Sequence, residues 1–168
     1  MDLSVWILSF LMIFMLHNLE EIITVEKWIQ QSYPRVQDKI PMSIRKELNK
    51  YKEITSVNFA VVVLVVSLFA SVFILISVVT EQYYLFLGIS LFFALNIFTH
   101  PLQAIYLRCY TPGLLTSLIL IIPFYSLFFY QFYDTNILNF DSIVRALIVM
   151  IFAVPVFLLS HKIGEKWD

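Results

Sequence analysis

Five long apolar segments set the first constraint on this chain, because about 20 apolar residues is the length of helix that crosses the hydrocarbon of a bilayer. The segments cover residues 3–25, 56–80, 83–107, 112–133 and 143–161. The connections between the later segments are too short to hold a second domain. We therefore expect one all-α domain over residues 1–168, a polytopic membrane helix bundle with about five transmembrane helices and a cytoplasmic loop over about residues 26–55.

Composition agrees with a membrane-embedded chain and excludes other classes of protein. Hydrophobic residues make up 60% of the 168 residues and charged residues only 14%, whereas soluble domains carry about 25% charged residues. The formal net charge of −1 gives no basic excess of the kind that nucleic-acid binding requires. The single cysteine, Cys109, excludes an intrachain disulfide and a thiolate-based metal cluster. The partner that composition predicts is the lipid bilayer.

The distribution of basic residues predicts the orientation of the bundle. Seven of the eleven lysines and arginines lie in the first loop: Lys27, Arg35, Lys39, Arg45, Lys46, Lys50 and Lys52. Short cytoplasmic loops are rich in these residues, so we expect the N-terminus outside and the C-terminus in the cytoplasm. Arg145 falls outside in this arrangement, where Asp141 could pair with it. A basic amphipathic helix capped by Ser43 could lie on anionic lipid within the same loop.

His17, Glu20 and Glu21 lie inside the first apolar segment, where ionisable side chains are costly to bury. On a helix, steps of three and four residues return to the same face, so both glutamates flank the line of His17. Two carboxylates and an imidazole in a dry environment suit a divalent metal, whose charge relieves the repulsion between the acids. The alternatives are that one glutamate is protonated, or that the pair extends to a nearby surface.

His100 supplies a second imidazole from the third segment, on a face that it shares with Asn96 and Gln103. Pro101 should kink this helix and free a backbone carbonyl. Counting residues from the helix ends places His17 and His100 in the same, cytoplasmic half of the bilayer. His100 is therefore a candidate metal ligand, while Asn96 and Gln103 either support the ligands or only form hydrogen bonds between helices.

The turn after the third segment holds Arg108, Tyr110 and the pair Thr111 and Pro112. Thr111 is the predicted N-cap of the fourth helix and Pro112 its first residue. The N-terminus of that helix beside Arg108 suits an anionic group such as a lipid phosphate or a substrate carboxylate. The hydroxyl of Tyr110 could reach a site at this depth. The alternative is a tight turn with an arginine placed by the cytoplasmic charge bias alone.

His161 is a further candidate ligand, at the end of the fifth segment. Glu165 follows one helical turn later and could support it. A solvated histidine–glutamate pair on a surface tail is the favoured alternative.

Three signatures together resemble the HXXEE-domain family of small integral membrane proteins. They are His17-x-x-Glu20-Glu21, a separate His100, and Tyr110-Thr111-Pro112-Gly113 as a Tyr-x-Pro-Gly turn. They stand in the family's order and extend from the first helix into the fourth. The resemblance implies a membrane fold with a metal-dependent, hydrolase-like site, no established substrate, and a bacterial cytoplasmic membrane as the location.

The favoured function is a membrane-embedded metal-dependent hydrolase that acts on a lipid or a membrane-associated peptide. His17, Glu20 and His100 would hold zinc, or else iron or manganese, and Glu21 would act as general base on a bound water. Spacing leaves open which glutamate binds and which acts. A metal- or proton-coupled transporter could use the same residues, and a non-catalytic membrane subunit could use them only to hold helices together.

Overall fold

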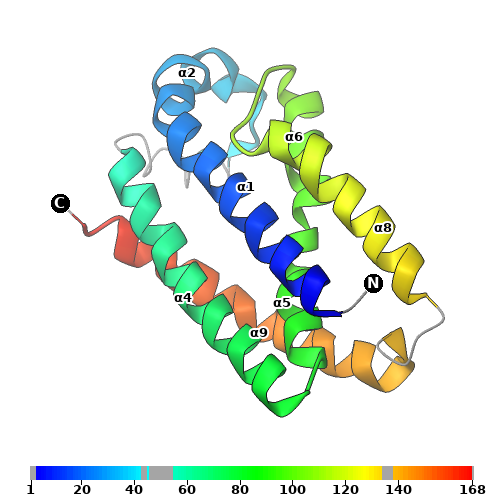
Figure 1. The fold of residues 1–168 in the computed structure, drawn as a ribbon. Coiled ribbons are helices and arrows are strands. Elements are labelled where there is room, and N and C mark those ends of the chain that lie inside the picture. The colour runs from blue at the N-terminus through cyan, green and yellow to red at the C-terminus, as the bar shows by residue number, and fades with distance from the viewer. Residues whose placement is uncertain (1–2, 43–44, 46–54, 134–137, 168) are drawn as a thin grey trace.

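The computed structural model describes residues 3–42, 45, 55–133 and 138–167, and this part of the chain is helical with no β-strand. Its spans are Leu3–Gln31 (α1), Ser56–Thr80 (α4), Tyr84–Leu107 (α5 and α6), Leu114–Phe132 (α7, η3 and α8) and Phe140–Gly164 (α9). All five are long and apolar enough to cross a membrane, which confirms the predicted all-α membrane bundle (Figure 1). The first helix continues to Gln31, past the predicted end near residue 25.

Two of the spans are not regular α-helices throughout. The third span divides into α5 (Tyr84–Ala94) and α6 (Asn96–Leu107), and the interruption lies at Leu95, earlier than the kink that Pro101 predicted. In the fourth span, α7 (Leu114–Thr116) passes into a π-helical segment, η3 (Ser117–Ile121), and then into α8 (Ile122–Phe132). Single π turns are frequent next to functional sites.

The start of the first loop packs against the end of α6. It forms two short helices, α2 (Tyr33–Val36) and η1 (Gln37–Lys39). Three of its apolar side chains are buried against Leu107: Tyr33, Val36 and Ile40. Lys39 Nζ donates to the Leu107 carbonyl at 3.0 Å, and the Tyr106 hydroxyl donates to the Lys39 carbonyl at 2.7 Å. The loop therefore supplies a donor to the last carbonyl of α6, one of the groups that a helix end leaves without partners.

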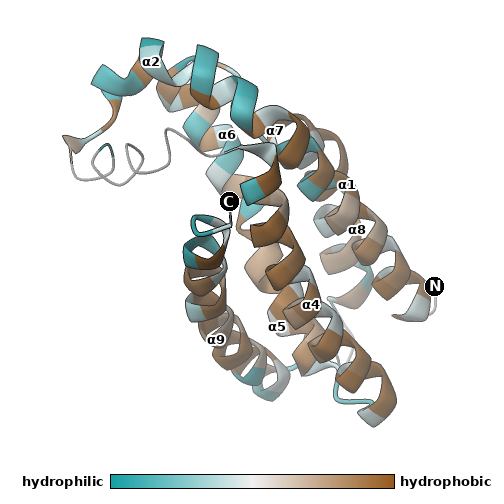
Figure 2. Cartoon of the chain, turned by 90° about the vertical axis from the view of Figure 1, so that its left-hand side faces the viewer, coloured by the Kyte–Doolittle hydropathy of each residue, from teal (hydrophilic) through white to brown (hydrophobic). Residues whose placement is uncertain are grey.

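One end of the bundle, called here the loop end, gathers the first loop, the end of α6 and the end of α9 (Figure 1). At this end Glu26 Oε2 accepts the backbone N–H of Ser56 at 2.9 Å, and the Asn58 amide donates to the Gly164 carbonyl at 3.1 Å. Hydrophilic residues concentrate on α2 and around the C-terminus (Figure 2). The predicted amphipathic helix that begins at Ser43 lies outside the described residues.

Apolar side chains both fill the interior and cover the outside. Trp6, Phe10, Phe86, Phe124 and Phe128 are buried together among α1, α5 and α8, with edge-on ring contacts such as Phe10 to Phe86 at 5.4 Å. On the outside, large apolar side chains stand exposed on every span, among them Ile23, Val79, Ile105 and Phe152. Such a surface requires lipid around it, so the protein is an integral membrane protein.

The α5 and α9 helices pack tightly against each other at Gly88. A Cβ atom at this position would lie 2.5 Å from the Cβ of Val149 and 2.7 Å from the Ala146 carbonyl oxygen. Small residues allow such close approach between membrane helices.

Candidate metal centre

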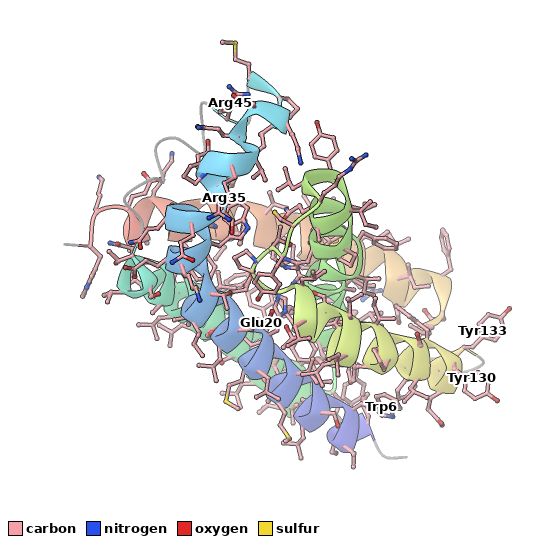
Figure 3. All side chains as sticks on the ribbon, turned by 90° about the horizontal axis from the view of Figure 1, so that it is seen from above. Trp6, Glu20, Arg35, Arg45, Tyr130 and Tyr133 are labelled. Carbon is pink, nitrogen blue, oxygen red and sulfur yellow. The ribbon has the colours of Figure 1, made fainter. Side chains whose placement is uncertain are left out.

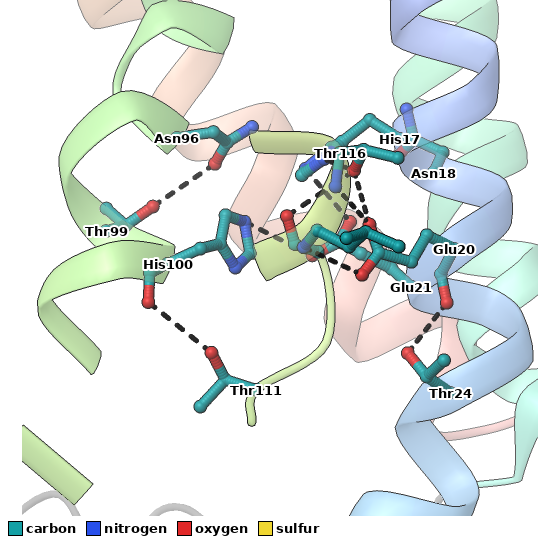
Figure 4. Close-up of polar contacts among 12 residues, drawn as sticks. His17, Asn18, Glu20, Glu21, Thr24, Asn96, Thr99, His100, Thr111 and Thr116 are labelled. Carbon is teal, nitrogen blue, oxygen red and sulfur yellow. Dashed lines mark hydrogen bonds and ion pairs between the residues drawn. The ribbon is translucent and has the colours of Figure 1, made fainter. Parts of the chain in front are cut away.

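Three ionisable side chains from two spans converge inside the bundle (Figure 4). His17 and Glu21 lie one turn apart on α1, and His100 lies on α6. Glu21 Oε2 is 3.8 Å from His17 Nε2, and Glu21 Oε1 is 3.5 Å from His100 Nε2. One ligand atom from each residue lies within 4.8 Å of the others, and the two imidazole centroids are 4.9 Å apart. The two histidines that were predicted from separate segments are thus in contact.

This group is almost closed to the surroundings. His17 is 1% exposed and His100 8% exposed, and the Glu21 side chain is 17% exposed. The ring of Phe93 packs edge-on against the His17 imidazole with centroids 5.3 Å apart. The His17 Nε2 atom is buried and has no hydrogen-bond partner within the described residues. A buried imidazole nitrogen beside a carboxylate, with no hydrogen-bond partner of its own, is a position that could hold a cation or a shared proton.

Glu20 has a different environment, although it neighbours Glu21 in the sequence. Its carboxylate faces the start of the fourth span (Figure 3). Oε1 accepts from the backbone N–H of Leu115 at 3.1 Å and from the Tyr110 hydroxyl at 2.5 Å. Oε2 accepts from the backbone N–H of Thr116 at 2.7 Å and from its hydroxyl at 2.5 Å. Glu20 therefore caps a helix of another segment, and the acid that faces both imidazoles is Glu21.

The N-terminus of the fourth span, which the sequence indicated as a place for an external anion, binds this internal carboxylate. The first N–H groups of a helix lack partners and carry partial positive charge, so a buried carboxylate is stabilised there. The prediction that Thr111 caps this helix and Pro112 begins it was wrong. The two residues form a turn, and the helix begins at Leu114. The Thr111 hydroxyl instead donates to the His100 carbonyl at 3.4 Å.

Gly113 brings the turn against both imidazoles. Its φ of +79° lies in the left-handed region, which glycine adopts without strain. A Cβ atom here would lie 2.7 Å from His100 Cε1 and 2.8 Å from His17 Cε1. Only a residue without a side chain fits between the rings at this distance.

Thr116 connects Glu20 to the group of His17, Glu21 and His100. Its hydroxyl lies 2.8 Å from His17 Nδ1 and 2.5 Å from Glu20 Oε2. The sequence pattern gave no indication of this residue, since a threonine in an apolar helix start has no distinctive spacing. Gly113 did have a signal, as the last residue of the Tyr-x-Pro-Gly turn, but its contact with the imidazoles follows only from the fold.

Tyr110 supports Glu20 from outside the spans. Its hydroxyl donates to Glu20, and its carbonyl accepts from the indole nitrogen of Trp28 at 2.7 Å. Partial burial and, second in importance, the hydrogen bond to the Glu20 carboxylate raise the pKa of Tyr110 to about 12. The hydroxyl consequently remains a donor over the whole neutral range.

The other predicted site residues do not join the group of His17, Glu21 and His100 in the described structure. His161 lies on α9 with its ring against Phe157, at a centroid distance of 4.7 Å. Asn96 accepts a hydrogen bond from Thr99 at 3.3 Å, and Gln103 is exposed. Arg108 is exposed and takes a left-handed conformation, with φ of 56°, at the end of α6.

Comparison with known proteins agrees with these signatures. Residues 8–129 match the model of a family described as "Protein of unknown function with HXXEE motif". The uncharacterized protein YrkK of Bacillus subtilis (strain 168) is 30% identical over 155 residues, which cover 90% of each chain. No solved structure matches the chain. The matched region includes His17, Glu20, Glu21, His100 and the Tyr110–Gly113 turn, and the chain belongs to the HXXEE family.

Proposed function

We propose that this protein is a membrane-embedded, metal-dependent hydrolase whose His17, Glu21 and His100 side chains hold one divalent cation. The observation that carries the proposal is the contact of two buried imidazoles with a single carboxylate, in which His17 Nε2 has no partner among the described residues. In a dry site, a carboxylate and two neutral imidazoles form a favourable environment for a cation. Without a cation, burying these polar groups costs free energy that their contacts with one another do not compensate.

The distances fit a small ion. Ligand atoms at about 2.1 Å from a tetrahedral zinc ion stand about 3.4 Å from each other. Glu21 Oε1 lies 3.5 Å from His100 Nε2 and Glu21 Oε2 lies 3.8 Å from His17 Nε2, both near this separation, and one ligand atom from each of the three residues lies within 4.8 Å of the others, so binding an ion would draw the group together slightly. Two nitrogen ligands and one carboxylate leave a coordination position open, as in catalytic zinc sites. The same donor set also accepts iron or manganese.

The chemistry follows from this donor set. A divalent cation held here would supply Lewis-acid activation of a water molecule. Glu21 contributes charge neutralisation and a second oxygen that can accept a proton. The Phe93 ring packs edge-on against the His17 imidazole and covers one side of it. The Glu20 carboxylate accepts four hydrogen bonds in this arrangement, so its oxygens are not free to act as the base. Glu20 instead supports the site.

The substrate class follows from the position of the site. His17 lies fourteen residues into α1, about 21 Å along the helix at about 1.5 Å per residue, which is within the membrane-crossing part of the span. A substrate that reaches this depth is a lipid or a membrane-associated peptide. The site is nearer the loop end of the third span. The seven basic residues of the first loop support a cytoplasmic position for that end, and the Bacillus subtilis relative supports a bacterial membrane.

Metal content of the purified full chain tests the proposal. Protein in detergent is incubated with zinc, iron or manganese in turn, separated from free metal, and analysed by mass spectrometry of the elements. We expect stoichiometric metal in the wild type, and loss of most of it in His17→Ala, His100→Ala and Glu21→Gln. His161→Ala is the matched control, because it removes an imidazole outside the group, and it should bind as the wild type does. Wild-type protein that retains none of the three metals overturns the proposal.

A second measurement separates catalysis from binding. Metal-loaded wild type and His17→Ala are incubated with membrane lipids and with membrane-inserted peptides, and the products are identified by mass spectrometry. Products that depend on His17 support the hydrolase. If the variants lose thermal stability while no product ever depends on the metal ligands, the residues act as structural contacts between helices.

A further inference from the structure

The hydroxyl of Thr116 lies between the His17 imidazole and the Glu20 carboxylate. On one side it lies 2.8 Å from His17 Nδ1, and on the other side 2.5 Å from Glu20 Oε2. Neither contact was indicated by sequence spacing. The direction of the proton in each of the two hydrogen bonds decides which nitrogen of His17 is left for a metal.

Counting donors and acceptors fixes the direction of the first bond. A carboxylate has about four lone-pair positions, two on each oxygen. Both positions on Glu20 Oε1 are filled, by Tyr110 and by the N–H of Leu115. The N–H of Thr116 fills one position on Oε2, and the Thr116 hydroxyl takes the other. Three donors already converge on Glu20, so it is the acceptor in this network, and the geometry has the Thr116 hydroxyl donate to its Oε2.

The direction of the second bond follows. A threonine hydroxyl has one hydrogen, and Glu20 Oε2 at 2.5 Å is a much closer acceptor for it than the Gly113 carbonyl at 3.4 Å. The oxygen can only accept from His17, so His17 Nδ1 must carry a hydrogen. In a neutral imidazole the other nitrogen then presents a lone pair, and this is the buried Nε2 atom beside Glu21.

We propose that Glu20 and Thr116 are positioning residues which hold His17 in the tautomer with hydrogen on Nδ1, so that Nε2 is prepared to bind the cation. This inference rests on the proposed function for its purpose, but the tautomer itself is a property of the metal-free protein. It gives the adjacent glutamates separate tasks: Glu21 faces the ion, and Glu20 acts on His17 through a hydroxyl. Outer hydrogen bonds of this kind fix ring orientation and tautomer in metal sites.

The test uses the full chain in detergent, labelled with ¹⁵N in its histidine side chains and freed of metal. Nitrogen NMR distinguishes a ring nitrogen with hydrogen from one without, and His17→Asn assigns the signal. We expect hydrogen on Nδ1 of His17 in the wild type and in Thr116→Ser, which keeps the hydroxyl. Thr116→Val is similar in volume but lacks the hydroxyl. In this variant we expect the ring hydrogen to redistribute from Nδ1 toward Nε2, where the N–H can donate a hydrogen bond to Glu21.

Zinc affinity, measured by competition with a chelator, is the second readout. We expect Thr116→Val to bind zinc about 10- to 100-fold more weakly than the wild type, and Thr116→Ser to restore binding. Hydrogen on Nε2 in the wild type overturns the inference, whatever the stability of the Thr116 variants. Equal zinc affinity in the wild type and Thr116→Val also overturns it, while leaving the metal site itself intact. If no protein binds metal but the tautomer is as expected and moves in Thr116→Val, the positioning stands and the metal-dependent function fails.

Discussion

Replacing Gly113 by alanine should damage the candidate metal centre through both imidazoles at once. The added Cβ atom would lie 2.7 Å from His100 Cε1 and 2.8 Å from His17 Cε1. Carbon atoms in contact are normally about 3.5–4.0 Å apart, so one or both rings must retreat by about 0.7–0.8 Å or more. The positive φ of 79° adds strain, because an alanine in the left-handed region costs about 1–2 kcal/mol.

The two costs can be combined as an order of magnitude. Overpacking of a closed site costs about 1–3 kcal/mol, so the total loss of folding free energy is about 2–5 kcal/mol. Displaced imidazoles also no longer match the geometry of one ion, and we expect zinc affinity to fall by about 10-fold or more. The assays are thermal unfolding in detergent, followed by circular dichroism, and zinc competition on the folded fraction.

Gly88→Ala is the matched control, because its Cβ would meet Val149 at 2.5 Å in the contact between α5 and α9, away from the imidazoles. It should lower the unfolding temperature while its folded fraction binds zinc as the wild type does. Folded Gly113→Ala with wild-type zinc affinity would refute the assigned role of this glycine. Equal loss of zinc binding in both variants would show that the effect reflects general loosening of the bundle.

Two further predictions concern the supports around the site. Asn58→Ala removes amide donors to the carbonyls of Gly164 and Trp167, at 3.1 and 2.5 Å, and should cost about 1–3 kcal/mol of stability without changing metal content, as thermal unfolding and elemental analysis can show. Tyr110→Phe removes one donor from Glu20 and should lower the unfolding temperature at neutral pH. Since the folded-state pKa of Tyr110 is raised from 10.0 to about 12, its contribution is fully present below pH 10 and is lost as pH rises through about 12. The difference between the wild type and Tyr110→Phe should shrink over that interval, and a difference that stays constant would contradict this role.

The spans and the meeting of the two imidazoles could be predicted because each leaves a strong mark on the sequence. Apolar runs near 20 residues determine membrane helices through length and hydropathy alone. His17 and His100 are polar groups in hydrocarbon, so each needs a partner inside the bundle, and another helix's polar group is the nearest choice. Their convergence required only that the first and third spans be neighbours.

The division of work between Glu20 and Glu21 could not be predicted from spacing. Both residues flank the face of His17, at steps of three and four, and the sequence treats them alike. The rotation of α1 relative to the fourth span decides between them, because the free N–H groups of Leu115 and Thr116 attract one carboxylate and leave the other to the imidazoles. The position of that helix start was also missed, since the local signals of Thr111 and Pro112 favoured an earlier one.

The π-helical segment η3 follows directly after Thr116 and has a consequence for the whole fourth span. A single π turn inserts one extra residue, which shifts the facing of everything beyond it by about 100°. Before the insertion, the span can therefore present Thr116 to His17 of α1. After the insertion, it can turn Phe124 and Phe128 toward Trp6 of the same helix. An uninterrupted α-helix would bring only one of these two registers into place, so the irregular turn lets a polar site and an aromatic core share the same short helix.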